Sequence, residues 1–402
     1  MFKETDKNYS YETEILRKGA YIHANASNPE TAPIYLTTAF NVEDLDELYS
    51  RYEEKGFCYN RNRNPNRNAL AELMTYTEKG EDSVICSSGM AAISTTILSL
   101  TQAGDHIVSD RTLYGEAIDI FTEIMSKYKV EVTFCDFTDI EEVKAAIRDN
   151  TQILYTETIS NPMISVPDLS AIAQEAHKHD ALFIVDNTFM TSVGITPISF
   201  GADIVVNSLT KFANGHSDAV CGSITGKSQL IAKMHHYQIL LGCTADAFTS
   251  WMVQRGMRTI QLRVEKQMEN AAKLAAALEA SPYIKKVFHP SLRSHAQHEL
   301  AIKEFKDINH CGGMLSIYLA DDDMKKINQF LRTLNLAHYA MTLGGYRTTL
   351  AHPVSSSHYD IPEEERLKMG ITNSMLRISA GIEKSEDLIE DFNQALECIY
   401  GK

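Results

Sequence analysis

Ala202-Asp-Ile-Val-Val-Asn-Ser-Leu-Thr-Lys211 joins a short apolar run to two hydroxyl side chains, Ser208 and Thr210, and ends in a lysine. Such a run predicts a buried strand with the polar residues at its carboxyl end. Hydroxyls that can hold a phosphate beside a lysine amine suggest a Schiff base between Lys211 and pyridoxal phosphate. The alternative is a solvated surface lysine, and the rest of the chain has to decide between the two.

The same alternation of short apolar runs and helical stretches extends from about residue 61 to about residue 256. The runs are Ser83–Cys86, His106–Ser109, Glu131–Asp136, Ile153–Thr158, Leu182–Asp186, Ile204–Asn207 and Ala219–Thr225. This rhythm predicts an α/β domain built on a mostly parallel, seven-stranded sheet. Ligands bind where loops leave the carboxyl ends of such strands. Four polar residues fall at or just after these ends: Ser88, Asn161, Asp186 and Ser208.

The chain on either side of this region has a different pattern. Residues 1–60 are mixed in charge and contain Pro29 and Pro33, which predicts an extended N-terminal arm with little core of its own. A long helical pattern from Thr259 to Ala280 leads into a smaller α+β region that ends in a charged helix, Ser385 to Ile399. We therefore predict an arm (1–60), a cofactor-binding domain (61–256) and a C-terminal α+β domain (257–402).

Asp186 ends the apolar run Ile184-Val-Asp-Asn-Thr188, 25 residues before the lysine. A carboxylate there could keep a pyridine nitrogen protonated, and a cationic ring stabilises the negative charge that remains when a Cα proton leaves. The low dielectric of a buried site strengthens such a charge pair. The alternative is a helix-capping aspartate at a strand-to-helix turn.

Two further segments suit a phosphate. Ser88-Gly89-Met90 opens an apolar helical stretch, and small residues at a helix start let backbone N–H groups approach an anion. Tyr59 and Arg61 stand two apart in a segment that we expect to be extended, so that both side chains point the same way. An arginine fork donates two parallel hydrogen bonds to a phosphate. An ordinary turn and a solvated basic loop are the alternatives.

Taken together, these motifs resemble the Cys/Met-metabolism family of pyridoxal phosphate enzymes. The motifs are Tyr59-x-Arg61, Ser88-Gly89-Met90, Tyr114-Gly115, Asn161-Pro162, Asp186-Asn187-Thr188, Ser208-x-Thr210-Lys211 and Leu376-Arg-Ile-Ser-Ala-Gly-Ile-Glu383. The resemblance covers nearly the whole chain. It implies the aspartate aminotransferase-like fold, fold type I, with a large sheet domain and a smaller C-terminal domain.

The resemblance also implies a role for each matching residue. Three would be catalytic: Lys211 as the Schiff-base lysine and proton carrier, Asp186 at the pyridine nitrogen, and Tyr114 stacked on the cofactor ring. Asn161 would bond the 3′-oxygen, and Ser88, Gly89, Met90, Ser208 and Thr210 would hold the phosphate. Tyr59 and Arg61 would reach the phosphate of a neighbouring subunit, and Tyr59 would also approach the substrate there. This implies a homo-oligomer, which we expect to be a homotetramer built as a dimer of active dimers. Arg377, with Thr342 beside it, would bind the substrate α-carboxylate.

The chain departs from its relatives around the predicted substrate. Methionine γ-lyases typically have Cys after Tyr-Gly, where this chain has Glu116, and their usual Lys-Asp pair is missing around Gln238. Cystathionine γ-lyases and the synthases usually have Glu where this chain has Met341. We hypothesise that Glu116 contacts the distal part of the substrate, with a cationic group as one possibility. The alternative is a solvent-facing glutamate in the first turn of a helix.

These observations favour an α,γ-eliminating lyase that acts on a sulfur-containing amino acid and releases 2-oxobutyrate, ammonia and a thiol. β-Elimination is a second activity that the same machinery would support. The alternative is γ-replacement, as in O-acetylhomoserine sulfhydrylase or cystathionine γ-synthase. A non-enzymatic alternative is a catalytically inactive sensor or scaffold that only binds the cofactor. Such a protein would have lost Lys211, Asp186 or Arg377, and all three are present.

Composition fits an enzyme of this kind. The net charge of −15 argues against nucleic-acid and acidic-membrane binding. No apolar run is long enough for a membrane span, and seven scattered cysteines suggest reduced thiols in a cytoplasmic compartment. The histidines have no coherent ligand spacing, so we expect no metal.

Overall fold

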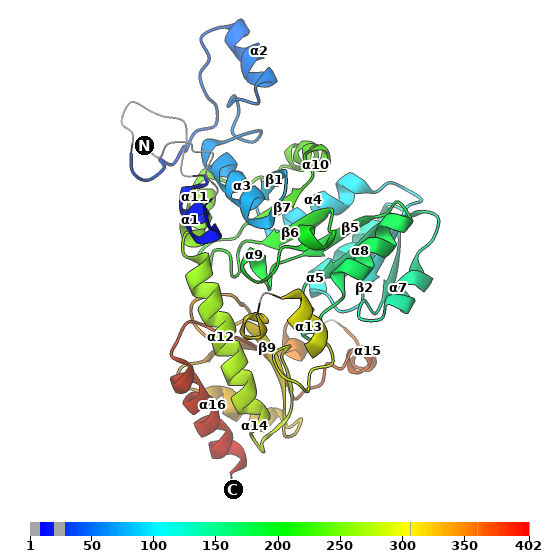
Figure 1. Cartoon of the computed structure of the whole chain (residues 1–402), viewed down its shortest axis with the longest axis vertical. Helices are drawn as coiled ribbons and strands as arrows, with labels where there is room; N and C mark the ends of the chain where they lie inside the picture. The colour runs from blue at the N-terminus through cyan, green and yellow to red at the C-terminus, as the bar shows by residue number, and fades with distance from the viewer. Residues whose placement is uncertain (1–8, 20–28, 306, 360, 402) are drawn as a thin grey trace.

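The computed structural model describes residues 9–19, 29–305, 307–359 and 361–401, and Figure 1 shows the whole chain. Its centre is a seven-stranded sheet in the order β1-β7-β6-β5-β4-β2-β3. All strands run the same way except β7, which pairs antiparallel with both neighbours. The strands are β1 (Asp82–Cys86), β2 (His106–Asp110), β3 (Glu131–Cys135), β4 (Thr151–Glu157), β5 (Leu182–Asp186), β6 (Ile204–Ser208) and β7 (Gly222–Gly226). The predicted α/β class and mostly parallel sheet are confirmed.

Both faces of this sheet are buried, because alternate residues of each strand enter different apolar clusters. Val185 and Val205 belong to one cluster, whereas their neighbours Ile184, Ile204 and Val206 belong to the other. Helices from both sides complete these clusters. They are α3 (Pro65–Glu78), α4 (Gly89–Leu100), α5 (Gly115–Asp119), α6 (Met125–Lys127), α7 (Ile140–Ala146), α8 (Leu169–Lys178), α9 (Thr191–Gly194), α10 (Ser228–Leu241) and α11 (Ala247–Met257).

Helix α12 (Ile260–Glu279) runs from the large sheet into the smaller C-terminal region (Figure 1). There a five-stranded sheet, ordered β10-β11-β12-β9-β8, packs against helices. The strands are β8 (Ile284–Phe288), β9 (Met314–Leu319), β10 (His338–Tyr339), β11 (Thr349–Ala351) and β12 (Met375–Ser379). The helices after α12 are α13 (His298–Glu304), α14 (Met324–Thr333), α15 (Glu363–Lys368) and α16 (Ser385–Tyr400).

The N-terminal segment divides into a docked part and a projecting part. Helix α1 (Tyr11–Arg17) lies on the body, where the Tyr11 hydroxyl and that of Ser192 are 2.9 Å apart. Helix α2 (Leu45–Glu53) has no buried residue and stands clear of the sheet at the top of Figure 1. The three-part division of the chain stays a prediction.

Candidate active site

A cavity of about 370 Å³ lies at the carboxyl ends of the parallel strands, where C-terminal segments close over them. It brings together twelve of the predicted site residues: Ser88, Gly89, Met90, Tyr114, Glu116, Asn161, Asp186, Ser208, Thr210, Lys211, Thr342 and Arg377. Ten other residues complete the lining, among them Glu157, Thr188 and the serines 356 and 357. Tyr59 and Arg61 are not in this lining.

Lys211 lies in the turns that follow β6. Its N–H donates to Ser208 O at 3.2 Å, and Gly215 N–H donates to Lys211 O at 2.8 Å. Burial, followed by the positive charge of Arg377, lowers the pKa of the amine, whereas the charge of Glu116 raises it. A lysine with a lowered pKa is a better base and nucleophile near neutral pH than a solvated one. The alternative of a surface lysine is therefore excluded.

A buried arginine from α12 holds the Lys211 turn in place. The Arg263 guanidinium donates to Phe212 O at 3.0 Å and to Ala213 O at 3.1 Å. On the other side, Gly344 packs so closely that an added Cβ would stand 2.4 Å from Phe212 N. These contacts attach the C-terminal region to the lysine turn.

Asp186 ends β5 and is almost completely buried. Its Oδ1 accepts the Thr188 N–H at 2.9 Å, and burial raises its pKa to about 6. In the part of the chain that the structure describes, no cation pairs with this carboxyl group. A buried acid of this kind lacks a positive partner, and a protonated pyridine nitrogen would provide one.

The predicted phosphate cradle is formed by the start of α4 and the end of β6. Ser88 caps the helix by accepting Ala91 N–H at 3.0 Å, which leaves the N–H groups of Gly89 and Met90 without acceptors inside the helix. An added Cβ on Gly89 would stand 2.7 Å from Ser208 Cβ, so glycine permits this close approach. Free N–H groups and a hydroxyl at a helix start suit a phosphate.

Thr210 makes a contact that its sequence pattern does not suggest. Its hydroxyl donates to Cys221 O at 3.2 Å and accepts Cys221 N–H at 3.1 Å. It lines the cavity while it bridges the lysine turn to the segment before β7. Its binding to phosphate stays a prediction.

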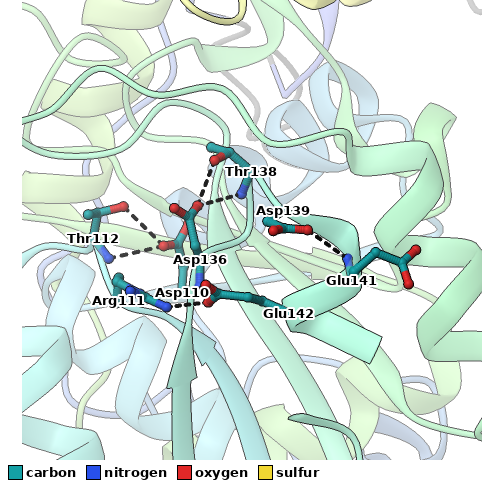
Figure 2. A network of polar contacts seen from close by, with 8 residues as sticks. All are labelled: Asp110, Arg111, Thr112, Asp136, Thr138, Asp139, Glu141 and Glu142. Atoms are coloured by element: carbon teal, nitrogen blue, oxygen red, sulfur yellow. Dashed lines mark hydrogen bonds and ion pairs between the residues drawn. The ribbon is translucent and has the colours of Figure 1, made fainter. Parts of the chain in front are cut away.

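The turn that leads from β2 to Tyr114 is held by a network of polar side chains (Figure 2). Asp110 Oδ1 accepts hydrogen bonds of 3.0 Å from both the N–H and the hydroxyl of Thr112. Beside it, Arg111 forms an ion pair with Glu142. The network fixes where the chain leaves the sheet and so the position of Tyr114, which directly precedes α5.

Tyr114 is half-buried, and its phenol is kept protonated. Burial, followed by the charge and a hydrogen bond of Glu116, raises the phenol pKa. The backbone N–H of Tyr114 donates to Glu157 Oε1 at 2.8 Å. The residue is thus attached to β4 by its backbone, while its ring lines the cavity.

Arg377 belongs to β12 and lies buried beneath the cavity. Its Nη1 donates to Asn161 Oδ1 at 2.8 Å, which leaves the amide nitrogen of Asn161 available for another acceptor. No carboxylate of the described residues forms an ion pair with Arg377. A buried guanidinium without a counter-ion suits an anionic ligand such as an α-carboxylate.

Glu116 and Thr342 lie at the cavity wall. Glu116 is exposed, but its charge acts on both Tyr114 and Lys211, so it faces the site and not only the solvent. Thr342 accepts a 3.3 Å hydrogen bond from the Thr349 hydroxyl through its carbonyl oxygen. Their contacts with a substrate stay predictions.

The expectation of an extended segment at Tyr59 and Arg61 is wrong. Asn62 and Arg63 donate their N–H groups to Tyr59 O at 3.0 and 3.1 Å, so the chain turns here. The guanidinium of Arg61 lies over the Tyr59 ring, 5.3 Å from its centroid. Because Tyr59 is 46% exposed, the pair faces away from this chain's own core.

Glu157 is the functional candidate that sequence analysis missed. It is the register partner of Asp186 on the neighbouring strand, and burial raises its pKa well above the ordinary value, with the charge of Asp186 adding to the effect. Its position in the sequence could have revealed it, because Glu157 lies at the carboxyl end of an apolar strand, as Asp186 does. Thr188 was also missed; its hydroxyl accepts Ser208 N–H at 2.8 Å and joins β5 to β6.

No cluster of ligands suited to a metal ion occurs among the described ranges. The helices described in the structure include none with the length and hydropathy of a membrane span.

Comparisons with known proteins show the family to which the chain belongs. The model of the Cys/Met metabolism PLP-dependent enzyme family matches residues 12–397. The chain is 36% identical over 398 residues to L-methionine γ-lyase of Fusobacterium nucleatum subsp. polymorphum, covering 98% of this chain and 99% of the relative. It is 37% identical to cystathionine γ-lyase of Bacillus subtilis, covering 95% and 100%.

A solved structure is similar over the same extent. Cystathionine γ-synthase from Xanthomonas oryzae pv. oryzae, in complex with aminoacrylate and cysteine, superposes with a TM-score of 0.92 at 30% identity. The similarity covers 98% of this chain and 100% of the other. Lyases and a synthase thus share the fold with this chain.

Proposed function

Because this chain belongs to the Cys/Met metabolism family of PLP-dependent enzymes, we propose that it eliminates the γ-substituent of a sulfur-containing amino acid. The products would be 2-oxobutyrate, ammonia and a thiol, from a substrate of the methionine, homocysteine or cystathionine type. The observation that supports the proposal is that Lys211, Tyr114 and Arg377 line one cavity, where they would serve as the base, the acid and the anion site.

The bound cofactor supplies an electron-withdrawing ring that stabilises negative charge beside the substrate amino group. Asp186 would face its pyridine nitrogen, and Asn161 would donate from its free amide nitrogen to the ring oxygen. The helix start at Gly89 and Met90, with Ser208 and Thr210, would hold the phosphate. Buried carboxyl groups without cations and free N–H groups fit these parts of the cofactor.

Lys211 would attach the cofactor and then serve as the base of the reaction. A burial-lowered pKa raises the fraction of neutral amine, which can take a proton from Cα and then from Cβ of the substrate. The contacts of Arg263 and Gly344 with the Lys211 turn would keep the amine in a fixed position from which it could reach both carbons. Removal of the second proton distinguishes γ-elimination from β-elimination.

Tyr114 would protonate the departing group. Its raised pKa keeps the phenol protonated at neutral pH, so it can give a proton to a leaving thiolate. Arg377 would bind the α-carboxylate and thereby orient the γ-carbon. β-Elimination from cysteine or cystathionine needs only the first proton removal, so we include it as a side activity.

The experiment is product identification from the purified, cofactor-loaded protein. L-Methionine, L-homocysteine, L-cystathionine, L-cysteine and O-acetyl-L-homoserine are supplied separately, with and without sulfide. We expect 2-oxobutyrate without sulfide from at least one of the first three. An amino-acid product that depends on sulfide would establish γ-replacement, and pyruvate alone would establish a β-lyase.

We also propose that the active form is at least a dimer, in which Tyr59 and Arg61 reach the phosphate of the neighbouring subunit and Tyr59 also approaches its substrate. Their exposure on a turn beside the projecting α2 supports this. Co-expression of an Arg61→Ala chain with a Lys211→Ala chain tests it. In a mixed dimer, one site would combine an intact Lys211 from one chain with an intact Arg61 from the other, so activity should return. A mixed dimer that stays inactive would contradict a shared site.

A further inference from the structure

Three cysteine thiols lie next to the phosphate cradle. Cys86 ends β1 immediately before the cradle, Cys221 precedes β7, and Cys243 follows α10. All three are free thiols; Cys86 and Cys221 are buried, whereas Cys243 is partly exposed. Only Cys243 among them is open to a reagent from solvent. None of these thiols has a role in the proposed elimination reaction.

Cys86 and Cys243 come from two segments that pair directly. Ser87 N–H donates to Cys243 O at 2.9 Å, and Cys86 forms an antiparallel bridge with Thr244. Both sulfurs also contact one residue: the Gln238 side-chain amide approaches Cys86 Sγ at 3.6 Å, and Gln238 O lies 4.0 Å from Cys243 Sγ. The two thiols also form a hydrogen bond with each other, which brings the sulfurs close enough for a disulfide.

The two thiols differ in their chemistry. A hydrogen bond with Cys86, followed by one with Thr95, lowers the pKa of Cys243 to about 6, although burial acts in the opposite direction. The Thr95 hydroxyl lies 3.1 Å from Cys243 Sγ. A hydrogen bond with Cys243 and complete burial raise the pKa of Cys86 well above the ordinary value. One thiol is therefore an accessible thiolate and the other a protonated partner.

We propose that Cys243 is an oxidant-sensitive modification site and that Cys86 is its resolving partner. The Cys243 thiolate attacks hydrogen peroxide, the O–O bond breaks, and a sulfenic acid and hydroxide form. The Cys86 sulfur then attacks the sulfenic sulfur, the S–O bond breaks, and the Cys86 proton leaves with that oxygen as water. The two sulfurs are oxidised to a disulfide by two electrons in total, and peroxide is reduced.

The disulfide would act on cofactor binding through the chain that follows Cys86. Ser88 caps α4, and Gly89 already packs against Ser208 with no room for a methyl group. A shift of Cys86 toward Cys243 therefore also moves Ser88 and Gly89 of the phosphate cradle, because the tight packing against Ser208 cannot absorb the movement. We expect the oxidised protein to bind pyridoxal phosphate at least roughly 10-fold more weakly, with recovery after reduction.

The experiment treats the loaded protein with hydrogen peroxide, alkylates the remaining thiols, and maps disulfides by mass spectrometry of an unreduced digest. We expect a peptide that links Cys86 to Cys243 and disappears with dithiothreitol. In a Cys86→Ala variant, a sulfenic-acid trap should label Cys243 instead. Cys398→Ser is the matched control for the exposed cysteine and should leave the linked peptide unchanged.

The control for the functional consequence is Cys243→Ser, which removes the peroxide target and should keep the cofactor affinity constant after treatment. A link between Cys86 and Cys221, or no labelling of Cys243 in either protein, would overturn the proposal. Disulfide mapping does not depend on the substrate, so this result and the failure of the proposed elimination activity can be told apart.

Discussion

The backbone N–H of Tyr114 donates a 2.8 Å hydrogen bond to the carboxyl group of Glu157, which ties the loop after β2 to the end of β4. Glu157 in turn stands opposite Asp186 in the register of β4 and β5. Two buried acids at neighbouring strand ends cannot both ionise without strong repulsion, and burial raises the pKa of Glu157 well above the ordinary value. Glu157 is thus a neutral anchor for the proposed acid Tyr114.

Glu157→Gln should therefore change kcat/KM by less than about 3-fold at neutral pH, because glutamine keeps the acceptor and resembles the protonated acid. Glu157→Ala removes the acceptor for the Tyr114 N–H, which costs about 1–3 kcal/mol and should lower kcat/KM roughly 10-fold or more. Steady-state kinetics of the matched pair checks this. If kcat/KM fell as far in Glu157→Gln as in Glu157→Ala, the negative charge of an ionised Glu157 would be required, and the assignment of a neutral acid would be wrong.

Cofactor affinity should rise with pH through the titration of Asp186. Its pKa is about 6 in the folded protein against an ordinary 3.8, because it is buried. A raised pKa means that its contribution to the stability of the cofactor-free protein is complete below about pH 4 and is lost as the pH rises through about 6. A cationic pyridine nitrogen beside Asp186, as proposed, would favour the ionised carboxylate, so that cofactor binding would release a proton.

Fluorescence titration of the cofactor-free protein between pH 5 and 8 measures this dependence. The Asp186→Asn variant is the control, since it keeps the shape of the side chain and cannot ionise. A rise in affinity that wild type shows and Asp186→Asn lacks is the contribution of the Asp186 carboxyl group. Parallel curves for both proteins would contradict the assignment.

Lys211→Ala should abolish the reaction, with kcat/KM reduced roughly 10⁴-fold or more, because the variant would lack both the proposed covalent attachment and the proposed base. Lys227→Ala is a matched control, because Lys227 lies on the surface 3.8 Å from Asp203. The 2-oxobutyrate assay follows both variants. Substantial turnover by Lys211→Ala would disprove its role as the base.

Arg377→Gln should raise KM more than it lowers kcat, since the α-carboxylate that the guanidinium is proposed to bind does not react. Loss of a charge-assisted, bidentate contact costs about 1.5–3 kcal/mol or more, so kcat/KM should fall roughly 10²-fold. The methyl ester of the substrate removes the same contact from the other side. Wild type should discriminate strongly between acid and ester, whereas the variant should not.

Glu116→Gln should lower the pKa of the Tyr114 phenol, because Glu116 raises it by charge and hydrogen bonding. The alkaline limb of the pH–rate profile should therefore move to lower pH. If the carboxylate also faces the distal substrate group, activity on cystathionine, which carries a distal ammonium, should fall about 10-fold relative to methionine. An unchanged preference between cystathionine and methionine would disprove the role of Glu116 in specificity. The expected shift of the pH–rate profile does not depend on that result.

Much of the candidate site was predictable because the carboxyl ends of parallel strands lie at one edge of the sheet, where ligands bind. Asp186 and Ser208 end parallel strands, so the strand pattern predicted that both lie at the same edge of the sheet, and the structure shows that the two strands are neighbours. Glu157 was missed because strand order decides its neighbour, and the pairing of β4 with β5 is not written in the local sequence. The turn at Tyr59 differs from the expected extended segment because two backbone N–H groups donate to Tyr59 O, a contact that the spacing of Tyr59 and Arg61 does not reveal.

The sequence by itself determined the α/β class, the helix start at Ser88-Gly89-Met90 and the lysine after its strand, because local periodicity and residue chemistry specify strands and helix caps. Only the tertiary structure decided which groups change their acidity. Burial raises the pKa of Asp186 and lowers that of Lys211. Contact between Cys86 and Cys243, which lie far apart in the sequence, lowers the pKa of Cys243. Desolvation and through-space contacts depend on packing, which no single segment of the chain contains.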